Sequence, residues 1–193
     1  MCKFHFGRIL GQGMERICYE NTDNPCTCFK VSSKEHCKQT LREGAYFKYL
    51  RNRNIFPSFM PKFIGLYETE DSYIIEQELI QDTKEIKTQT LRDFILHATD
   101  DQMNDLQAVL VSTFNEMLAL NIIVSDMRTT NIFVLSHHGV PYKLVIFDGY
   151  GAPEFIPFPN YIRFFGERKI KRQLKKFKRY YEEDLKKRLD NAS

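Results

Sequence analysis

Two acidic residues and one asparagine lie at the ends of short apolar segments in the second half of the chain. Asp126 and Asn131 belong to a polar run that follows the apolar residues 122–124, and Asp148 ends the apolar run 143–147. Buried polar groups cost free energy unless they bind something. Carboxylate and amide oxygens are ligands that Mg²⁺ accepts, so we interpret Asn131 and Asp148 as candidate metal ligands. Asp126 is then a candidate base or orienting group for an incoming hydroxyl; turn capping is the alternative for each residue taken singly.

Residues in the first third of the chain have the types that contact phosphate groups. Gly11 and Gly13 lie between two short β-like segments, and glycine lets backbone amides approach a phosphate closely. Lys30 lies in a third such segment, and Glu43 follows thirteen residues later in a helical stretch. A lysine in this position reaches phosphates while a carboxylate holds its ammonium group. An ordinary hairpin turn and two solvated surface charges are the alternatives.

The elements that must position these residues change character along the chain. The first part is rich in strands around one helix, and the second part is mainly helical with one strand pair. This order predicts an α+β fold with two lobes, residues 1–80 and residues 81–193. The periodicity of apolar residues, together with turn residues, predicts strands at 6–10, 17–19, 27–31, 62–69, 72–80, 132–135 and 143–147. The same signals predict helices at 34–51, 90–97, 101–120 and from 164 onward.

Composition excludes several classes of protein. The chain has 193 residues, of which 42% are hydrophobic and 27% charged, and this composition is typical of a folded globular protein. No stretch approaches the roughly 18 apolar residues of a spanning helix, and the first residues do not resemble a signal peptide. We therefore expect a cytoplasmic location. An odd number of cysteines argues against a disulfide framework. Zinc binding by Cys26, Cys28, His36 and Cys37 stays open, although their spacing fits no common zinc module.

Charge is concentrated near the C-terminus. The net charge is +3, yet residues 161–190 hold twelve basic and five acidic residues, so the rest of the chain sums to −4. Ile170, Phe177 and Leu185 belong to an apolar stripe, which predicts a helix packed on the second lobe. The basic segment 163–179 also suits an anionic membrane surface or an acidic partner, which would place the protein at the inner face of the membrane. No specific nucleic acid is expected.

The order of these motifs resembles the protein-kinase-like superfamily, because a glycine loop, a strand lysine, a helix glutamate, D-x-x-x-x-N and D-G follow one another. More narrowly, the chain is similar to the small bacterial kinase-like proteins of the YrbL, or PhoP regulatory network, family. The matching segments are Leu10-Gly11-x-Gly13, Arg16-x-Cys18-Tyr19, Phe29-Lys30-Val31, Arg42-Glu43 with Tyr46 and Tyr49, and Ile123-Val124-Ser125.

The resemblance implies a minimal bilobal kinase-like fold and an ATP- and Mg²⁺-dependent phosphotransferase. Lys30, held by Glu43, would bind the phosphates of ATP, Asn131 and Asp148 would bind the metal, and Asp126 would orient the acceptor hydroxyl. The phosphate loop would be Gly11, Gln12 and Gly13, and the adenine would lie between the lobes, near Cys18, Gln77, Glu78 and Leu79. The acceptor stays open among protein, sugar, glycolipid and small metabolite.

Several departures from the kinase pattern favour a second hypothesis. Arg16 occupies the third glycine position, Val124-Ser125 replaces His-Arg, and Gly149-Tyr150 follows Asp148 in place of Phe-Gly. Only 42 residues follow Gly151, too few for the lower half of an ordinary kinase C-lobe. The alternative is therefore a nucleotide-binding pseudokinase that acts as a regulatory scaffold.

Overall fold

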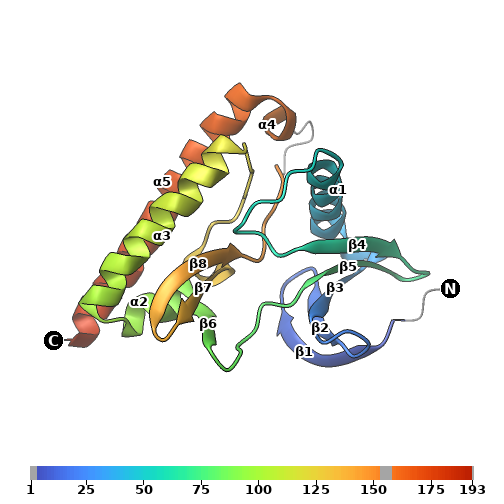
Figure 1. The fold of residues 1–193 in the computed structure, drawn as a ribbon. Helices are drawn as coiled ribbons and strands as arrows, with labels where there is room; N and C mark the ends of the chain where they lie inside the picture. Colours follow the sequence, from blue (N-terminus) through green and yellow to red (C-terminus); the bar gives the residue numbers. More distant parts are fainter. Residues whose placement is uncertain (1–3, 153–157, 193) are drawn as a thin grey trace. The chain divides into compact units, whose positions relative to one another are not determined.

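The structure is a computed structural model that describes residues 4–152 and 158–192 (Figure 1). The chain forms two compact units. The first comprises Met1–Phe56 and Pro61–Ile80, and the second comprises Pro57–Met60 and Gln81–Ser193. The first unit is an antiparallel sheet with one long helix, and the second is mainly helical with a small sheet. The α+β class expected from the sequence is confirmed.

The first unit is built on a five-stranded sheet with strand order β1-β2-β3-β5-β4. All neighbouring strands are antiparallel, and the strands predicted from alternation and turn residues are present. The predicted strand at 27–31 extends by two residues, because its whole length pairs with a central neighbour. The strands are β1 (Phe6–Gln12), β2 (Ile17–Asn21), β3 (Thr27–Ser33), β4 (Phe63–Glu68) and β5 (Ser72–Glu78).

One helix, α1 (Lys38–Asn52), packs on this sheet. The single helix predicted from residue 34 is divided, because a short 3-10 turn, η1 (Lys34–His36), ends at Cys37 before α1 begins. Ser33 caps the turn by accepting a hydrogen bond from the His36 amide. Gly44 allows close packing, since a Cβ atom there would lie 2.7 Å from a methyl carbon of Leu66 on β4.

The second unit contains a three-stranded antiparallel sheet with order β6-β7-β8. Its strands are β6 (Ile86–Thr90), β7 (Ile132–His137) and β8 (Val140–Ile146). The hairpin of β7 and β8 was predicted, but β6 was not. Residues 86–90 have one apolar side chain and no clear alternation, so the strand depends on its pairing with β7.

Helices make up most of the second unit. They are α2 (Leu91–His97), α3 (Asp100–Ala119), α4 (Phe158–Tyr161) and α5 (Arg163–Ala192), with a 3-10 turn, η2 (Thr129–Asn131). Thr99 and Gln102 form a capping box that explains why α3 begins at Asp100. No helix among the described residues is both long and apolar enough to cross a membrane.

Helix α5 packs along α2 and α3 (Figure 1). The ring of Phe177 lies 5.0 Å from that of Phe114 on α3, centroid to centroid. Ile170, Phe177 and, unexpectedly for charged residues, Lys169 and Asp184 are buried. The predicted apolar stripe therefore faces the protein, and two charged residues of α5 are buried along with it.

Candidate functional site

Three charged side chains of the first unit meet in its interior. Lys30 lies in the middle of β3 and Glu43 in α1, and both are buried, as is Arg16 at the start of β2. The Arg16 guanidinium donates to Glu43 Oε2, and Lys30 Nζ lies 3.9 Å from the same oxygen. Glu43, which has no exposed surface, therefore interacts with two cations, whereas the sequence indicated only one.

The glycine turn is tied to α1 by two consecutive residues. The Gly13 amide donates to the Arg16 carbonyl over 2.8 Å and closes the turn between β1 and β2. Glu15 accepts a hydrogen bond of 3.0 Å from the Gln39 amide in the first turn of α1. Together with the Arg16–Glu43 ion pair, this contact couples the position of the loop to that of the helix. Arg16 thus has a structural role that the glycine pattern alone did not indicate.

Most of the predicted adenine-contacting residues lie on the two strands that flank β3 and its Lys30: Cys18 is on β2, Gln77 and Glu78 are on β5, and Leu79 follows β5. Cys18 is the register partner of Lys30, and Cys28 is the register partner of Gln77. Cys28, two residues before Lys30, lies on the same face of β3 as Lys30. Its thiol lies 3.9 Å from the Glu78 carbonyl oxygen as a weak donor. Hydrogen bonding with Cys18, together with burial, raises the pKa of the Cys28 thiol well above its ordinary range, so Cys28 stays neutral.

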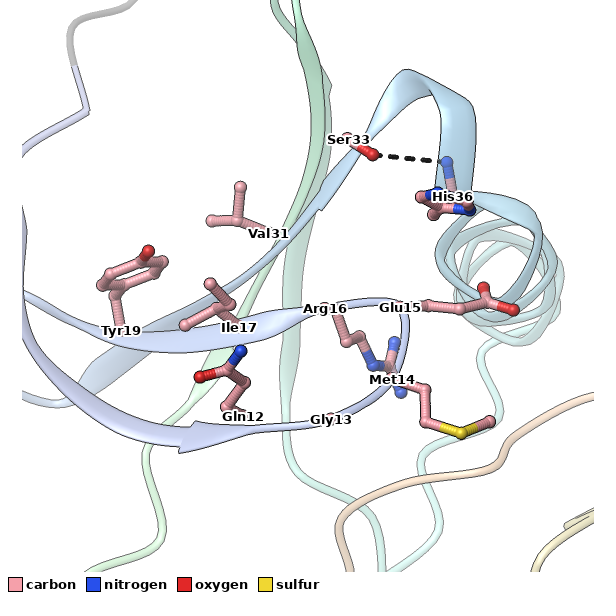
Figure 2. A pocket seen from close by; sticks show the side chains of 10 residues that line it. All are labelled: Gln12, Gly13, Met14, Glu15, Arg16, Ile17, Tyr19, Val31, Ser33 and His36. Atoms are coloured by element: carbon pink, nitrogen blue, oxygen red, sulfur yellow. Dashed lines mark hydrogen bonds between the residues drawn. The ribbon is translucent and has the colours of Figure 1, made fainter.

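A pocket of about 290 Å³ lies on the opposite face of these strands (Figure 2). Figure 2 shows Ile17, Tyr19 and Val31 projecting together along its wall. Ile17 and Val31 are register partners, one position away from Cys18 and Lys30, so alternation places the two pairs on opposite faces. Gln12 and Gly13 contribute to this pocket, and the other predicted nucleotide-contacting residues do not.

The cysteines described by the structure do not gather into a metal site. Cys18, Cys26, Cys28 and Cys37 are not joined in disulfide bonds. Within residues 4–152 and 158–192, no three histidine, cysteine, aspartate or glutamate side chains are arranged to hold a metal ion.

In the second unit, Asp126 and Asn131 are in direct contact. The Asn131 amide nitrogen donates to Asp126 Oδ2 over 3.0 Å, and η2 brings the two residues together. Arg128, which the sequence analysis did not single out, lies on the other side with Nε 3.3 Å from Asp126 Oδ1. In the sequence, the only indication of this role for Arg128 is that it is a charged residue two positions after the candidate base Asp126.

Asp148 and Gly149 pack against the same segment. The Gly149 carbonyl accepts hydrogen bonds from the Ser125 amide and hydroxyl, at 2.7 and 2.8 Å. Gly149 has φ +86°, and a Cβ atom on it would lie 3.1 Å from the backbone nitrogen and the Cβ of Asp126. Asp148 Oδ1 accepts from the Gly149 amide over 2.6 Å. Residues 125–126 and 148–149 are therefore held together, as the two motifs require for a common site.

Tyr150 anchors this segment in the interior. Its side chain is completely buried, and its hydroxyl donates to the Ile146 carbonyl over 2.6 Å. The backbone of Tyr150 also forms an isolated antiparallel bridge with Val124. A buried hydroxyl with a partner is stable in an apolar core, so tyrosine after Asp148-Gly149 is accommodated by a specific contact.

Helix α5 supports the loop between Asp126 and Asn131. Thr129 Oγ1 donates to Asp184 Oδ2 over 2.5 Å, and both side chains are buried. Arg92 on α2 donates to the other oxygen of Asp184 over 3.1 Å. Thr129 and Asp184 are 55 residues apart in the chain, so no local pattern connects them. Sequence reasoning missed this network for that reason.

Comparison with known proteins agrees with this architecture. Residues 5–182 match the family described as PhoP regulatory network protein YrbL. Among solved structures, Rad53 1–466 in complex with AMP-PNP is similar at a TM-score of 0.55 and 17% sequence identity, over 76% of this chain. The matched part is 39% of the Rad53 chain, so this chain spans well under half of that protein.

A search of functionally curated proteins gave no significant match. The likeness to Rad53 establishes the type of fold, and the family match covers most of the chain from β1 to α5. The chain therefore has a kinase-like fold and belongs to the YrbL family of PhoP regulatory network proteins.

Proposed function

We propose that the protein is a phosphotransferase that moves the γ-phosphoryl group of ATP, with Mg²⁺, to a hydroxyl acceptor. One observation carries the proposal: the 3.0 Å contact of Asn131 with Asp126, in a loop packed against Asp148-Gly149. A candidate base and two candidate metal ligands thereby belong to one locally ordered part of the second unit.

In this proposal Asn131 and Asp148 hold Mg²⁺. Asn131 donates to Asp126 through its nitrogen, which leaves the amide oxygen as the metal ligand. The ion neutralises charge on the phosphate oxygens. The residues fit the ion because both ligand atoms are hard oxygens.

Asp126 acts on the acceptor. Its carboxylate is about half exposed, so it is accessible to a hydroxyl group. It takes the hydroxyl proton as the new oxygen–phosphorus bond forms and the bond between the γ-phosphorus and ADP breaks. Asn131 and Arg128 orient the carboxylate for this step.

The lobe formed by residues 1–80 binds the nucleotide in this proposal, and the lobe formed by residues 81–193 carries the chemistry. Lys30 neutralises phosphate charge, and Glu43 holds its ammonium group. Gly11, Gln12 and Gly13 contribute the phosphate loop, and Cys18, Gln77, Glu78 and Leu79 contact the adenine. The acceptor is a protein, a sugar or a glycolipid hydroxyl.

The test is release of phosphate, or autophosphorylation, with radiolabelled ATP and Mg²⁺. We expect Asp126→Asn to lower the rate by about 100-fold or more, the usual contribution of a general base. Asp105→Asn, at an exposed position on α3, is the matched control and should leave the rate unchanged. Equal rates for the wild type and Asp126→Asn would overturn the assignment of Asp126.

A second candidate function is that of a nucleotide-binding scaffold without transfer. The pairing of Arg16 with Glu43 favours it, because the carboxylate that holds Lys30 is shared with a second cation. This alternative predicts a rise in melting temperature with ATP and Mg²⁺ but no turnover above the level of Asp126→Asn.

A further inference from the structure

One face of α5 carries a row of exposed basic side chains. Its members recur at intervals of three, one, three, one and three residues, which places them on a single side of a helix. No acidic residue occurs between positions 168 and 181. The members of this basic row are Arg168, Lys171, Arg172, Lys175, Lys176 and Arg179.

A group of exposed apolar side chains lies at the N-terminal end of the same region. Phe164 and Tyr161 have 62% and 57% of their surfaces exposed, far more than is usual for aromatic residues in a fold of this size. The rings of Phe158 and Phe165 lie 6.2 Å apart, so α4 and α5 both contribute. This aromatic patch consists of Phe158, Tyr161, Ile162, Phe164 and Phe165.

The aromatic patch and the basic row are continuous. Phe164 and Phe165 precede Arg168 by four and three residues, so they share its face of the helix. The Arg168 guanidinium lies over the Phe164 ring at 5.7 Å. Ile170 and Phe177, on the opposite face, are buried in the protein. Packing therefore uses one side of α5 and leaves this combined surface exposed.

Positive charge is greatest over residues 168–176. Beyond them, Lys178 pairs with Glu182 at 3.7 Å and Arg179 with Glu183 at 3.8 Å. Another ion pair, between Arg163 and Glu167 at 2.9 Å, lies beside the aromatic patch. The surface has an apolar end, a strongly basic middle and a partly neutralised far end.

We propose that this face of α5 binds the surface of an anionic lipid bilayer. Apolar rings that enter the headgroup region beside cations that contact lipid phosphates are the two components of interfacial binding. A nucleic acid is less well matched, because stacking sites alternate with cations along a strand, whereas these rings are gathered at one end and include Ile162. An acidic protein would use the basic row but would have no need of the neighbouring aromatic patch.

The experiment uses the absence of tryptophan from the natural chain. Phe164→Trp introduces a single fluorophore in the aromatic patch, and Tyr142→Trp places one at an exposed position on β8 of the same unit as a control. With phosphatidylcholine vesicles that contain phosphatidylglycerol, we expect a blue shift and loss of iodide quenching for Phe164→Trp only. Vesicles of phosphatidylcholine alone should produce neither change.

Charge variants separate a specific surface from net charge. Each cation near an anionic leaflet contributes about a five-fold gain in affinity. Lys171→Gln/Lys175→Gln/Lys176→Gln should therefore weaken vesicle sedimentation by about 100-fold at low salt. The control Lys38→Gln/Lys48→Gln/Lys62→Gln changes the same total charge at exposed positions of the first unit and should bind like the wild type.

Three outcomes would overturn the proposal. The first is absence of wild-type binding to anionic vesicles at low salt. The second is equal loss of binding in the two lysine triples, which would indicate attraction through net charge alone. The third is displacement of the protein from vesicles by a single-stranded oligonucleotide at equal phosphate concentration, which would assign this face to nucleic acid. None of these outcomes depends on whether the protein transfers phosphate.

Discussion

The polar residues of the first unit and those of the second are held in different ways. Arg16, Lys30 and Glu43 are buried, and their charges interact chiefly in the interior. Asp126 and Arg128 are about half exposed or more, and they are ordered by hydrogen bonds within one loop. Buried charges are costly unless they are paired, whereas exposed charges are screened by water.

This difference separates stability from function. Removal of one member of a buried charge cluster leaves the others uncompensated, so folding and the proposed nucleotide binding cannot be changed independently there. Removal of a half-exposed carboxylate leaves no such deficit. Variants of the second unit are therefore the cleaner reporters of chemistry, and variants of the first unit report both.

The largest expected effect is in the first unit. Glu43→Ala leaves Arg16 and Lys30 buried without their shared carboxylate, and we expect a loss of about 3–5 kcal/mol in the free energy of unfolding. Urea denaturation followed by circular dichroism measures it. Glu68→Ala, which removes an exposed partner of Lys34, is the control and should change stability little. Similar effects of the two substitutions would contradict the proposed role of the buried cluster.

Next in size is the network between α5 and the loop of the second unit. Asp184→Asn weakens the contacts with Thr129 and Arg92, and we expect a loss of about 2 kcal/mol because both the hydrogen bonds and the ion pair are affected. Hydrogen exchange at the amides of residues 126–131 should become faster. The adjacent Glu183→Gln, whose exposed carboxylate pairs with Arg179 at 3.8 Å, is the matched control. Unchanged exchange in Asp184→Asn would show that α5 does not support the loop.

We expect Asp148→Ala to lower stability less than the two previous variants. We also expect it to abolish the dependence of ATP binding on Mg²⁺. The side chain is only half-buried, so the fold should lose about 1 kcal/mol or less. Mg²⁺-dependent stabilisation by ATP should disappear, as measured by thermal shift with and without EDTA. An unfolded variant would mean that Asp148 is structural, and persistence of the Mg²⁺ effect would remove it from the metal site.

The smallest effect concerns an exposed pair, which completes the comparison. The Lys34 ammonium donates to Glu68 at 3.0 Å, which lowers the pKa of Glu68 and raises that of Lys34. Since folding lowers the pKa of Glu68, the unfolded state binds more protons in mildly acidic solution. The contribution of the pair is therefore present above the ordinary glutamate pKa and is lost as pH falls through the lowered one.

An NMR titration of the Glu68 side chain measures this shift. Lys34→Met should return the pKa of Glu68 toward its ordinary value and leave stability at neutral pH nearly unchanged. A titration of Glu68 that is the same with and without Lys34 would show that the pair does not persist in solution.

Local patterns carried much of the fold. Alternation and turn residues located the strands of the first unit, and helical periodicity located α3. The order of motifs was enough to indicate a kinase-like fold, because each motif is short and its spacing lies within a single element or loop. These features depend on residues that are neighbours in the chain, so they can be predicted without a structure.

Other features have no local signal. β6 exists because its backbone pairs with β7, 47 positions away on average, and its side chains do not encode a strand. In the sequence, Arg16 was notable only because it occupies the third glycine position of the loop. The structure shows that its guanidinium donates a hydrogen bond to Glu43, 27 residues away. Asp184 is buried against Thr129, 55 residues away in the chain, and no local pattern indicates that contact.

The amino-acid sequence by itself thus determined the class of fold, the position of most elements and the candidate residues for phosphate and metal binding. Tertiary structure alone decided which charges are buried together and which residues support the loop between Asp126 and Asn131. The physical reason is that burial and long-range pairing depend on which segments meet in space. The cost of burying a charge is then offset only by a partner that can be far away in the chain.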